Sequence, residues 1–345
     1  MVLNGSDEME KFYQKKFYFS YSGLNKLLYS PAAFYSHYVL NQREDSTDPH
    51  LVGGRVLHCL LFEPDRYDDY FISLPGKLPS DNPRKIIDNI FRIHLGYENN
   101  TLLLEDYSQD ILTQLLTANL YQNLKTDQQR LDKMLTEEHK EYFEFLKKSL
   151  NKSIVDQPTL DGCRAQVEIL KTNSDVRELL QLDKSEEDTH IETYNELHIK
   201  VDHDKIPFGL HGVLDNVVVD NESKMLFIND LKTTGKSIQD FPDAVDYYKY
   251  WIQGVIYAIL ATDKFLKDKP DKEDWEVHVT FIVIDKYNLV YPFQVSKESM
   301  SQWKSDFGEV LKIAKWHYEN KRYDLPYDLA VVILNCRFYG FKFCL

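Results

Sequence analysis

Two carboxylates and a lysine stand close together in residues 212–234, GVLDNVVVDNESKMLFINDLKTT. Asp230 and Lys232 are two residues apart in a strand-like stretch, so their side chains are expected on one face. A hairpin turn near residues 220–224 would bring Asp215 alongside them. Converging carboxylates supply the oxygen ligands that a hard divalent cation prefers, and a neighbouring lysine can orient or deprotonate an attacking water. The segment therefore indicates metal-assisted hydrolysis of a phosphodiester bond.

An ordinary surface salt bridge is the alternative explanation of Asp230 and Lys232, because a D-x-K pattern is common on strands by chance. The stretch before Asp230, residues 225–228, reads MLFI, so the pair stands at the end of an apolar strand. Charged groups at the end of a buried strand need partners or a function. The context therefore favours a catalytic role over a surface ion pair.

The elements expected to position these residues follow from the change of pattern near residue 190. Alternation of apolar and polar residues predicts strands, and apolar residues at intervals of three and four predict helices. The expected order is β-β-β-α-β-β-α, with strands at residues 190–202, 210–220, 225–234, 276–286 and 288–296 and helices at about 243–262 and 297–320. We therefore expect an α/β fold with a restriction-endonuclease-like core, in which helices flank a central mixed sheet.

The N-terminal half of the chain is expected to be helical. Ser20 or Ser22 could cap a helix that begins near Gly23, and Pro31 interrupts that helix. Apolar residues in the segment 53–67 also recur at helical spacing.

His58 lies inside the helix of the segment 53–67, which Pro64 ends. Residues 81–185 look helical throughout and are expected to form an insertion. The whole chain, residues 1–345, is interpreted as a single nuclease domain with a helical motif segment at 17–70, the insertion at 81–185 and an α/β catalytic core at 190–320.

The formal net charge of -14 argues against a protein that coats nucleic acid through bulk charge. It does not exclude a nuclease, because a metal site needs carboxylates and a local basic groove can sit on an acidic body. The aromatic fraction is 13%, and tyrosines such as Tyr247 and Tyr248, with Trp251, could stack on a separated base. For any single tyrosine, burial in the core is the more common role.

Cysteine usage and hydropathy indicate the cellular compartment. The cysteines Cys59, Cys163, Cys336 and Cys344 form no CxxC pair, so a zinc ribbon is not expected. Their wide spacing is unlike a secreted disulfide scaffold, and the sequence has neither a signal region nor an apolar run long enough to span a membrane. A reduced, cytoplasmic protein without a membrane partner is expected.

Five separated motifs, taken together, resemble the RecB-like branch of the PD-(D/E)XK nucleases. They are the S-x-S-x-L-x-x-L-x-x-S-P segment from Ser20 to Pro31, G-R-V-L-H followed by L-F-E-P-D-R-Y at 54–67, G-x-x-D at 212–215, D-L-K-T-T at 230–234, and Gln253 with Tyr257 as Q-x-x-x-Y. Within that branch the chain is most similar to the RecE-type group, the C-terminal nuclease domain of exodeoxyribonuclease VIII. The resemblance covers about residues 18–70 and 160–260.

The resemblance implies a role for each matching residue. His58, Asp215 and Asp230 would be metal ligands, and the backbone carbonyl of Leu231 would contribute a further oxygen. Lys232 would position or activate water. On the following helix, Gln253 and Tyr257 would steady the lysine or contact the DNA phosphate. Outside this set, Glu196 precedes the Asp215 strand where related enzymes often carry an acid, but an ordinary exposed strand residue is the alternative interpretation.

The same resemblance implies a Mg²⁺-dependent deoxyribonuclease, with Mn²⁺ as a substitute, that acts on DNA ends in recombination. Such enzymes are of phage or prophage type, prefer double-stranded DNA with an end, and work with a single-strand annealing protein. The acidic net charge favours an enzyme that closes around DNA, as a homo-oligomer could. A structure-specific endonuclease or a catalytically silent DNA-binding module are the alternatives. Some relatives hold an iron–sulfur cluster through late cysteines; because only Cys336 and Cys344 are late, we expect no cluster.

Overall fold

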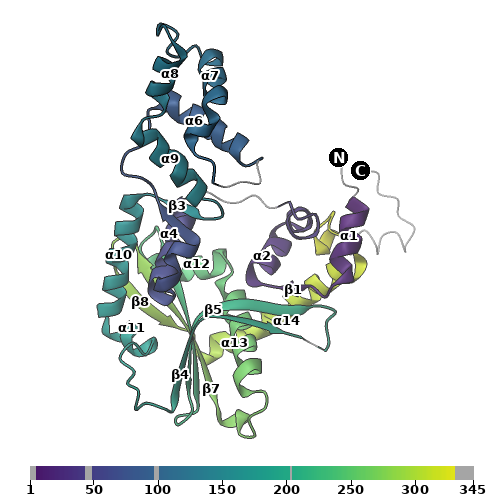
Figure 1. The fold of residues 1–345 in the computed structure, drawn as a ribbon. Helices are drawn as coiled ribbons and strands as arrows, with labels where there is room; N and C mark the ends of the chain where they lie inside the picture. Colours follow the sequence, from purple (N-terminus) through teal and green to yellow (C-terminus); the bar gives the residue numbers. More distant parts are fainter. Residues whose placement is uncertain (1–4, 43–48, 97–100, 203, 331–345) are drawn as a thin grey trace, which may run out of the picture. The chain divides into compact units, whose positions relative to one another are not determined.

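A computed structural model describes residues 5–42, 49–96, 101–202 and 204–330 of the chain (Figure 1). The chain divides into two compact units. The first unit consists of Met1–Asp48, Leu61–Glu63 and Gln166–Leu345, and the second of Pro49–Leu60 and Pro64–Ala165. Two helices, α4 (Pro49–Phe62) and α10 (Gln157–Thr172), contribute residues to both units.

The first unit is built on a mixed six-stranded sheet. Its strands are β1 (Tyr18–Phe19), β4 (Ile191–Val201), β5 (Gly209–Asp220), β6 (Met225–Thr234), β7 (Glu276–Asp285) and β8 (Val290–Gln294). Strands β4, β5 and β6 are antiparallel neighbours, β6 and β7 are parallel, and β7 and β8 are antiparallel (Figure 1). The five strands predicted from residue 190 onward are confirmed, whereas β1 is too short to leave a periodic signal.

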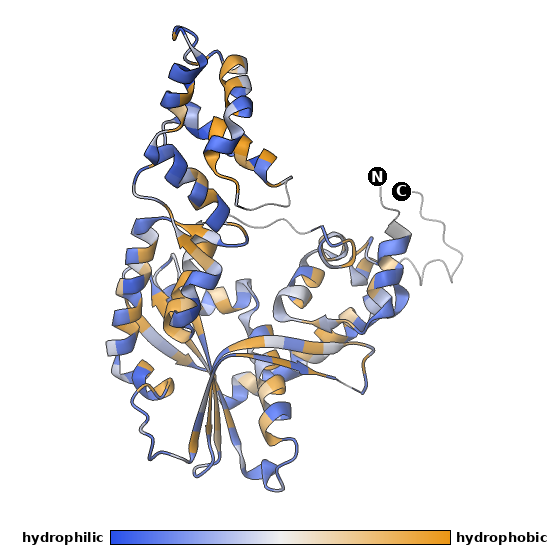
Figure 2. Ribbon diagram, viewed as in Figure 1, coloured by the Kyte–Doolittle hydropathy of each residue, from blue (hydrophilic) through white to orange (hydrophobic). Residues whose placement is uncertain are grey.

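Helices cover this sheet because their apolar residues are buried against it. The helices of the first unit are α1 (Gly5–Gln14), α2 (Tyr21–Tyr29), α3 (Pro31–Phe34), α11 (Ser174–Leu179), α12 (Phe241–Tyr247), α13 (Tyr250–Leu266) and α14 (Lys297–Asn320), with short turns at Tyr35–Val39, Ile238–Asp240 and Lys272–Asp274. Helix α13 packs on strands β4 to β7, and its residues Ile252, Val255 and Ile256 are fully buried. The sheet and α13 are accordingly among the most apolar parts of the chain (Figure 2).

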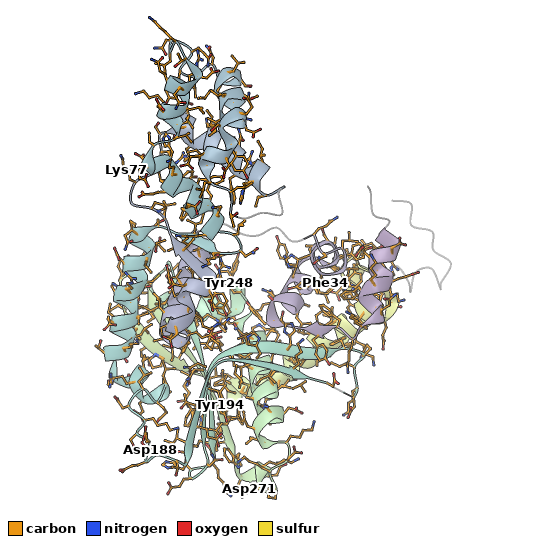
Figure 3. All side chains as sticks on the ribbon, in the orientation of Figure 1. Phe34, Lys77, Asp188, Tyr194, Tyr248 and Asp271 are labelled. Atoms are coloured by element: carbon orange, nitrogen blue, oxygen red, sulfur yellow. The ribbon has the colours of Figure 1, made fainter. Side chains whose placement is uncertain are left out.

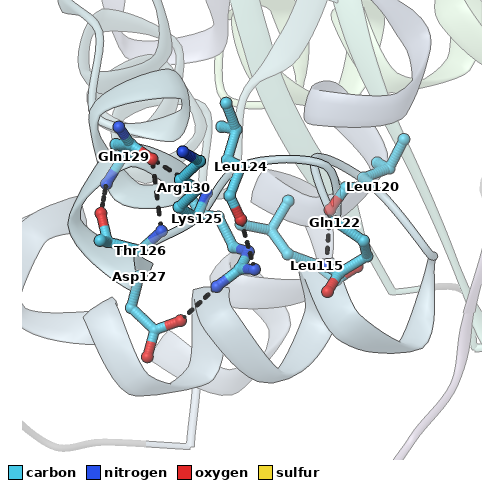
Figure 4. Close-up of polar contacts among 9 residues, drawn as sticks. All are labelled: Leu115, Leu120, Gln122, Leu124, Lys125, Thr126, Asp127, Gln129 and Arg130. Carbon is cyan, nitrogen blue, oxygen red and sulfur yellow. Dashed lines mark hydrogen bonds and ion pairs between the residues drawn. The ribbon is translucent and has the colours of Figure 1, made fainter.

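The second unit is mainly helical. Its further elements are α5 (Tyr67–Tyr70), α6 (Asp81–His94), α7 (Ser108–Thr117), α8 (Asp127–Met134), α9 (Glu137–Lys148), the strands β2 (Phe71–Ser73) and β3 (Ser153–Val155), and short turns at Pro64–Arg66 and Leu104–Tyr107. Ile87, Ile90 and Phe143 lie in its apolar core. At the start of α8 the Thr126 hydroxyl accepts a hydrogen bond from the backbone N–H of Gln129, and the Gln129 side-chain oxygen accepts one from the backbone N–H of Thr126 (Figure 4).

Two helical predictions are wrong in detail. Residues 81–185 are not helical throughout, because β3 pairs in parallel with β2. The helix predicted at 243–262 is two helices, α12 and α13, with Lys249 between them at φ 56°. The capping prediction is confirmed for Ser20, whose hydroxyl accepts a hydrogen bond from the Gly23 backbone. Of the helices in the described ranges, none is both long and apolar enough to cross a membrane.

Candidate active site

The β5–β6 hairpin places Asp215 and Asp230 side by side. Its ladder runs from Asp220 opposite Met225 to Asn216 opposite Asn229, so Asp215 and Asp230 are the next facing positions. There the Asp215 carboxylate, in place of a backbone carbonyl, accepts a hydrogen bond from the backbone N–H of Leu231 at 2.7 Å. Both carboxylates are buried, with Asp215 7% and Asp230 1% exposed. The predicted juxtaposition of Asp215 with Asp230 is therefore present.

Lys232 lies on the same face of β6 as Asp230 and forms an ion pair with its carboxylate. The ammonium group also lies 4.9 Å from the centre of the Tyr250 ring. Burial lowers the pKa of Lys232, but the charges of Asp230 and Asp215 outweigh burial, so the pKa is raised and the lysine is cationic at neutral pH. The salt bridge offered as the alternative explanation of D-x-K exists, but with a buried carboxylate rather than on the surface.

Helix α13 brings Gln253 and Tyr257 to the same carboxylate. The Gln253 amide donates to Asp230 Oδ1 at 2.9 Å and to the Tyr257 hydroxyl at 2.9 Å. The two residues are four apart, so they share one face of the helix. Burial, followed by the charges of Asp230 and Asp215, raises the pKa of Tyr257 well above its usual value, so the phenol stays protonated. Gln253 therefore fixes Asp230, and Tyr257 fixes Gln253.

The glycine of the G-x-x-D motif makes room for this contact. A Cβ atom at Gly212 would lie 2.8 Å from Cε1 of Tyr257 and 3.0 Å from Cδ1 of Leu260. Both neighbours belong to buried positions of α13, so neither can move away freely. The motif residues Gly212 and Tyr257 are thus explained by one close approach of helix to strand.

Gly212→Ala should lower the free energy of unfolding by about 1–3 kcal/mol, the usual cost of overpacking a core, because the new Cβ atom displaces Tyr257 from Gln253. Urea unfolding measures this loss. Gly308→Ala is the matched control, because Gly308 lies on α14 and a Cβ there meets nothing within 4 Å. Equal stability of Gly212→Ala and wild type would contradict the packing argument.

Glu196 completes a row of carboxylates and was not among the residues assigned a role from the sequence. The β4–β5 register, with Asn195 opposite Asn216 and Leu197 opposite Leu214, puts Glu196 across from Asp215. One carboxylate oxygen of each lies within 4.8 Å of the other. Glu196 has φ 45°, in the left-handed region that non-glycine residues rarely adopt, and such strain often marks functional positions.

Burial, joined at Glu196 by the charges of neighbouring carboxylates, disfavours the ionised form of the acids in this row. Burial first, then the charges of Asp215, Glu63 and Asp230, raise the pKa of Glu196 to about 8. Burial also raises the pKa of Asp215 to about 6, although Lys232 and the Leu231 N–H oppose the shift. One lysine therefore does not balance the negative charge of the row, and an added cation would.

A second row, of asparagines, crosses the same strands on the opposite face of the sheet. Asn216 donates to Asn195 at 2.9 Å, and Asn229 donates to Asn216 at 2.8 Å. Asn229 also donates to the backbone carbonyl of Leu179 at 2.9 Å. Because a one-residue slip would move every side chain to the other face, these amide hydrogen bonds hold the carboxylates in register.

The roles assigned to the remaining residues stay predictions. His58 is half-buried on α4 and belongs to the second unit, so its role as a ligand stays a prediction. Leu231 lies on β6, where its N–H contacts Asp215 and its carbonyl role likewise stays a prediction. Cys336 and Cys344, on which the expectation of no iron–sulfur cluster depends, lie outside the described residues.

Comparison with known proteins identifies the class. Residues 18–338 match the family model of the PD-(D/E)XK nuclease superfamily, and because this match spans most of the chain, the protein belongs to that superfamily. No curated protein matches the sequence significantly. A similar solved structure, described as a "Putative exonuclease" from Eubacterium rectale, is 11% identical with a TM-score of 0.43, over 90% of this chain and 86% of that chain. Superfamily membership confirms the predicted fold class and indicates a metal-using nuclease.

Proposed function

We propose that the protein is a divalent-metal-dependent DNA exonuclease that hydrolyses phosphodiester bonds from DNA ends. The observation that carries the proposal is the row of Glu196, Asp215 and Asp230 with Lys232 beside it, in a chain of the nuclease superfamily. Mg²⁺ is the expected metal, with Mn²⁺ as a substitute. The sequence resemblance to the RecE-type group supports the choice of exonuclease.

The donor set suits a hard cation. Carboxylate oxygens of Glu196, Asp215 and Asp230 would hold the metal, with the Leu231 carbonyl and a ring nitrogen of His58 as the further ligands that the family resemblance implies. The uncompensated negative charge of the row favours binding of a divalent ion. When bound, such an ion lowers the pKa of a water molecule and offsets the charge that develops on the phosphate.

The protein's own side chains would divide the remaining tasks. Lys232, held as a cation by Asp230, can donate hydrogen bonds to the attacking water or to a phosphate oxygen, so positioning suits it better than proton abstraction. Gln253 and Tyr257 hold the Asp230 carboxylate in one orientation. Preorganised groups of this kind act in a buried site where charges interact strongly.

The setting proposed with this activity is inside the cell, in recombination or end processing of phage or prophage type. The substrate would be double-stranded DNA with an end, and a single-strand annealing protein would receive the product strand. Assembly into a homo-oligomer is part of the same proposal, because an acidic chain without a bulk basic surface gains processivity by enclosing DNA.

Plasmid DNA tests the proposed activity. In Mg²⁺ the protein should degrade a linearised plasmid progressively and leave the covalently closed circle intact, and chelation with EDTA should stop the reaction. Asp215→Asn, which keeps the size and the hydrogen-bond acceptor but removes the charge, should abolish cleavage. Rapid cutting of the closed circle would favour a structure-specific endonuclease, and binding without any cleavage would favour a silent DNA-binding module.

A further inference from the structure

A continuous row of aromatic rings leads from Lys232 to the surface of the first unit. The Lys232 ammonium lies 4.9 Å from the Tyr250 ring, which stacks on Tyr248 with centroids 5.5 Å apart and planes 29° apart. Tyr248 in turn meets Tyr247 edge-on, with centroids 4.9 Å apart. Exposure rises along the row, from half-buried Tyr250 to 48% for Tyr248 (labelled in Figure 3) and 78% for Tyr247.

The backbone that carries the two outer rings is fixed. The Tyr248 carbonyl accepts hydrogen bonds from the Tyr21 hydroxyl and from the Asn25 side-chain amide at 3.3 Å. Tyr21 and Asn25 are four residues apart on one face of α2. Lys249 adopts φ 56° between α12 and α13, a conformation that costs a non-glycine residue about 1–2 kcal/mol. The strained break redirects the chain directly after Tyr247, the last residue of α12, and Tyr248, the residue that caps it.

The chemistry of this surface favours nucleobases over phosphates. Aromatic side chains stack on unpaired bases for about 1–3 kcal/mol per base, whatever the base. The neighbouring side chains Asp243 and Asp246 are exposed on α12 and would repel phosphate groups. A ligand held here must therefore be recognised by its flat apolar faces, and it must reach Lys232 at the inner end of the row.

We infer that Tyr247 is a stacking site for an unpaired base of the DNA strand that enters the active site, and that Tyr248 supports it. The inference rests on the proposed nuclease function and adds a substrate class, an unpaired strand terminus. The strand would be separated before it reaches Lys232. Tyr247 would hold the first bases by stacking while the reacting phosphate lies among Lys232 and the carboxylate row.

Binding of a short single-stranded oligonucleotide, with 2-aminopurine near its terminus, tests the inference in EDTA, where cleavage cannot occur. Tyr247→Leu keeps bulk but loses the flat ring, and should weaken binding about tenfold while relieving the quenching of 2-aminopurine. Tyr247→Phe keeps the ring and should bind like the wild type. The ratio of the dissociation constants of Tyr247→Leu and wild type should be unchanged between about 50 and 200 mM salt, because the substitution removes no phosphate contact.

Tyr327→Leu is the control, because Tyr327 packs edge-on against Trp316 of α14, which is not part of the row. Wild-type cleavage of the same oligonucleotide in Mg²⁺ is recorded in parallel. If the wild type cuts DNA but Tyr247→Leu binds the oligonucleotide as tightly as the wild type does, the stacking site is wrong. The proposed nuclease function would then remain. A wild type that neither cuts nor binds DNA overturns both.

Discussion

Lys232→Met should lower the rate of DNA cleavage by about 100-fold or more, since it removes a charged donor aimed at the reacting groups. In metal-free buffer it should also lower the free energy of unfolding by about 3 kcal/mol. The reason is that Asp230 is 1% exposed and its charge would remain buried without the ammonium partner. Chemical unfolding in EDTA and single-turnover cleavage in Mg²⁺ measure the two losses separately.

Magnesium should restore part of the stability of Lys232→Met, because a bound cation offsets the charge that the lysine no longer neutralises. Lys236→Met is the matched control: Lys236 follows four residues later, is exposed, and should change neither quantity by more than about 0.5 kcal/mol or about twofold. Cleavage by Lys232→Met within about tenfold of wild type would remove Lys232 from the proposed mechanism.

The central geometry of the site could be predicted because it depends on strand periodicity and one turn. Asp230 and Lys232 share a face by their spacing alone, and the polar turn at residues 220–224 sets the register that puts Asp215 beside them. Both signals are local. A shift of one residue in the register would move every side chain to the other face of the sheet. The sequence therefore carried both the fold class and the inner part of the candidate site.

Glu196 could not be assigned in the same way. Glu196 faces Asp215 because of the register between β4 and β5. The sequence of the connection between these strands does not specify that register. In addition, alternation along β4 made Glu196 look like an ordinary exposed residue, whereas it is half-buried with a left-handed backbone. The pairing of Asn195 with Asn216 reveals the position of Glu196 opposite Asp215, but that pairing is itself visible only in the structure.

The break between α12 and α13 was also hidden from the sequence. Residues 243–262 contain no proline, and the apolar periodicity continues through Tyr250 and Trp251. The interruption at Lys249 is accompanied by tertiary contacts, in which α2 side chains take the Tyr248 carbonyl that a continuous helix would use internally. Tertiary competition for one carbonyl therefore overrides local helix propensity.

Glu196→Gln should make the metal-free protein more stable at alkaline pH and abolish most of its stabilisation by Mg²⁺. A glutamate that titrates near 4.5 in the unfolded chain and at about 8 in the fold keeps its proton on folding between these values. Stability of the wild type should therefore fall as pH rises from about 4.5 to 8, and the loss is complete above that window. Glutamine avoids the loss, so at pH 9 in EDTA the variant should gain at least about 1 kcal/mol.

In Mg²⁺ the wild type should be the more stable of the two proteins, because only the ionised carboxylate of Glu196 can be a ligand. The bound cation then offsets the negative charges of the row. Thermal unfolding at pH 5 and pH 9, with EDTA or Mg²⁺, should therefore show a Mg²⁺-induced rise in Tm at pH 9 for the wild type and little rise for Glu196→Gln. Glu192→Gln is the control on the same strand, since Glu192 bonds to Tyr194 and Asn221 instead of facing Asp215. If Glu196→Gln kept the full Mg²⁺-induced rise in Tm, Glu196 would not be a ligand, and the metal would be held by Asp215 and Asp230 without it.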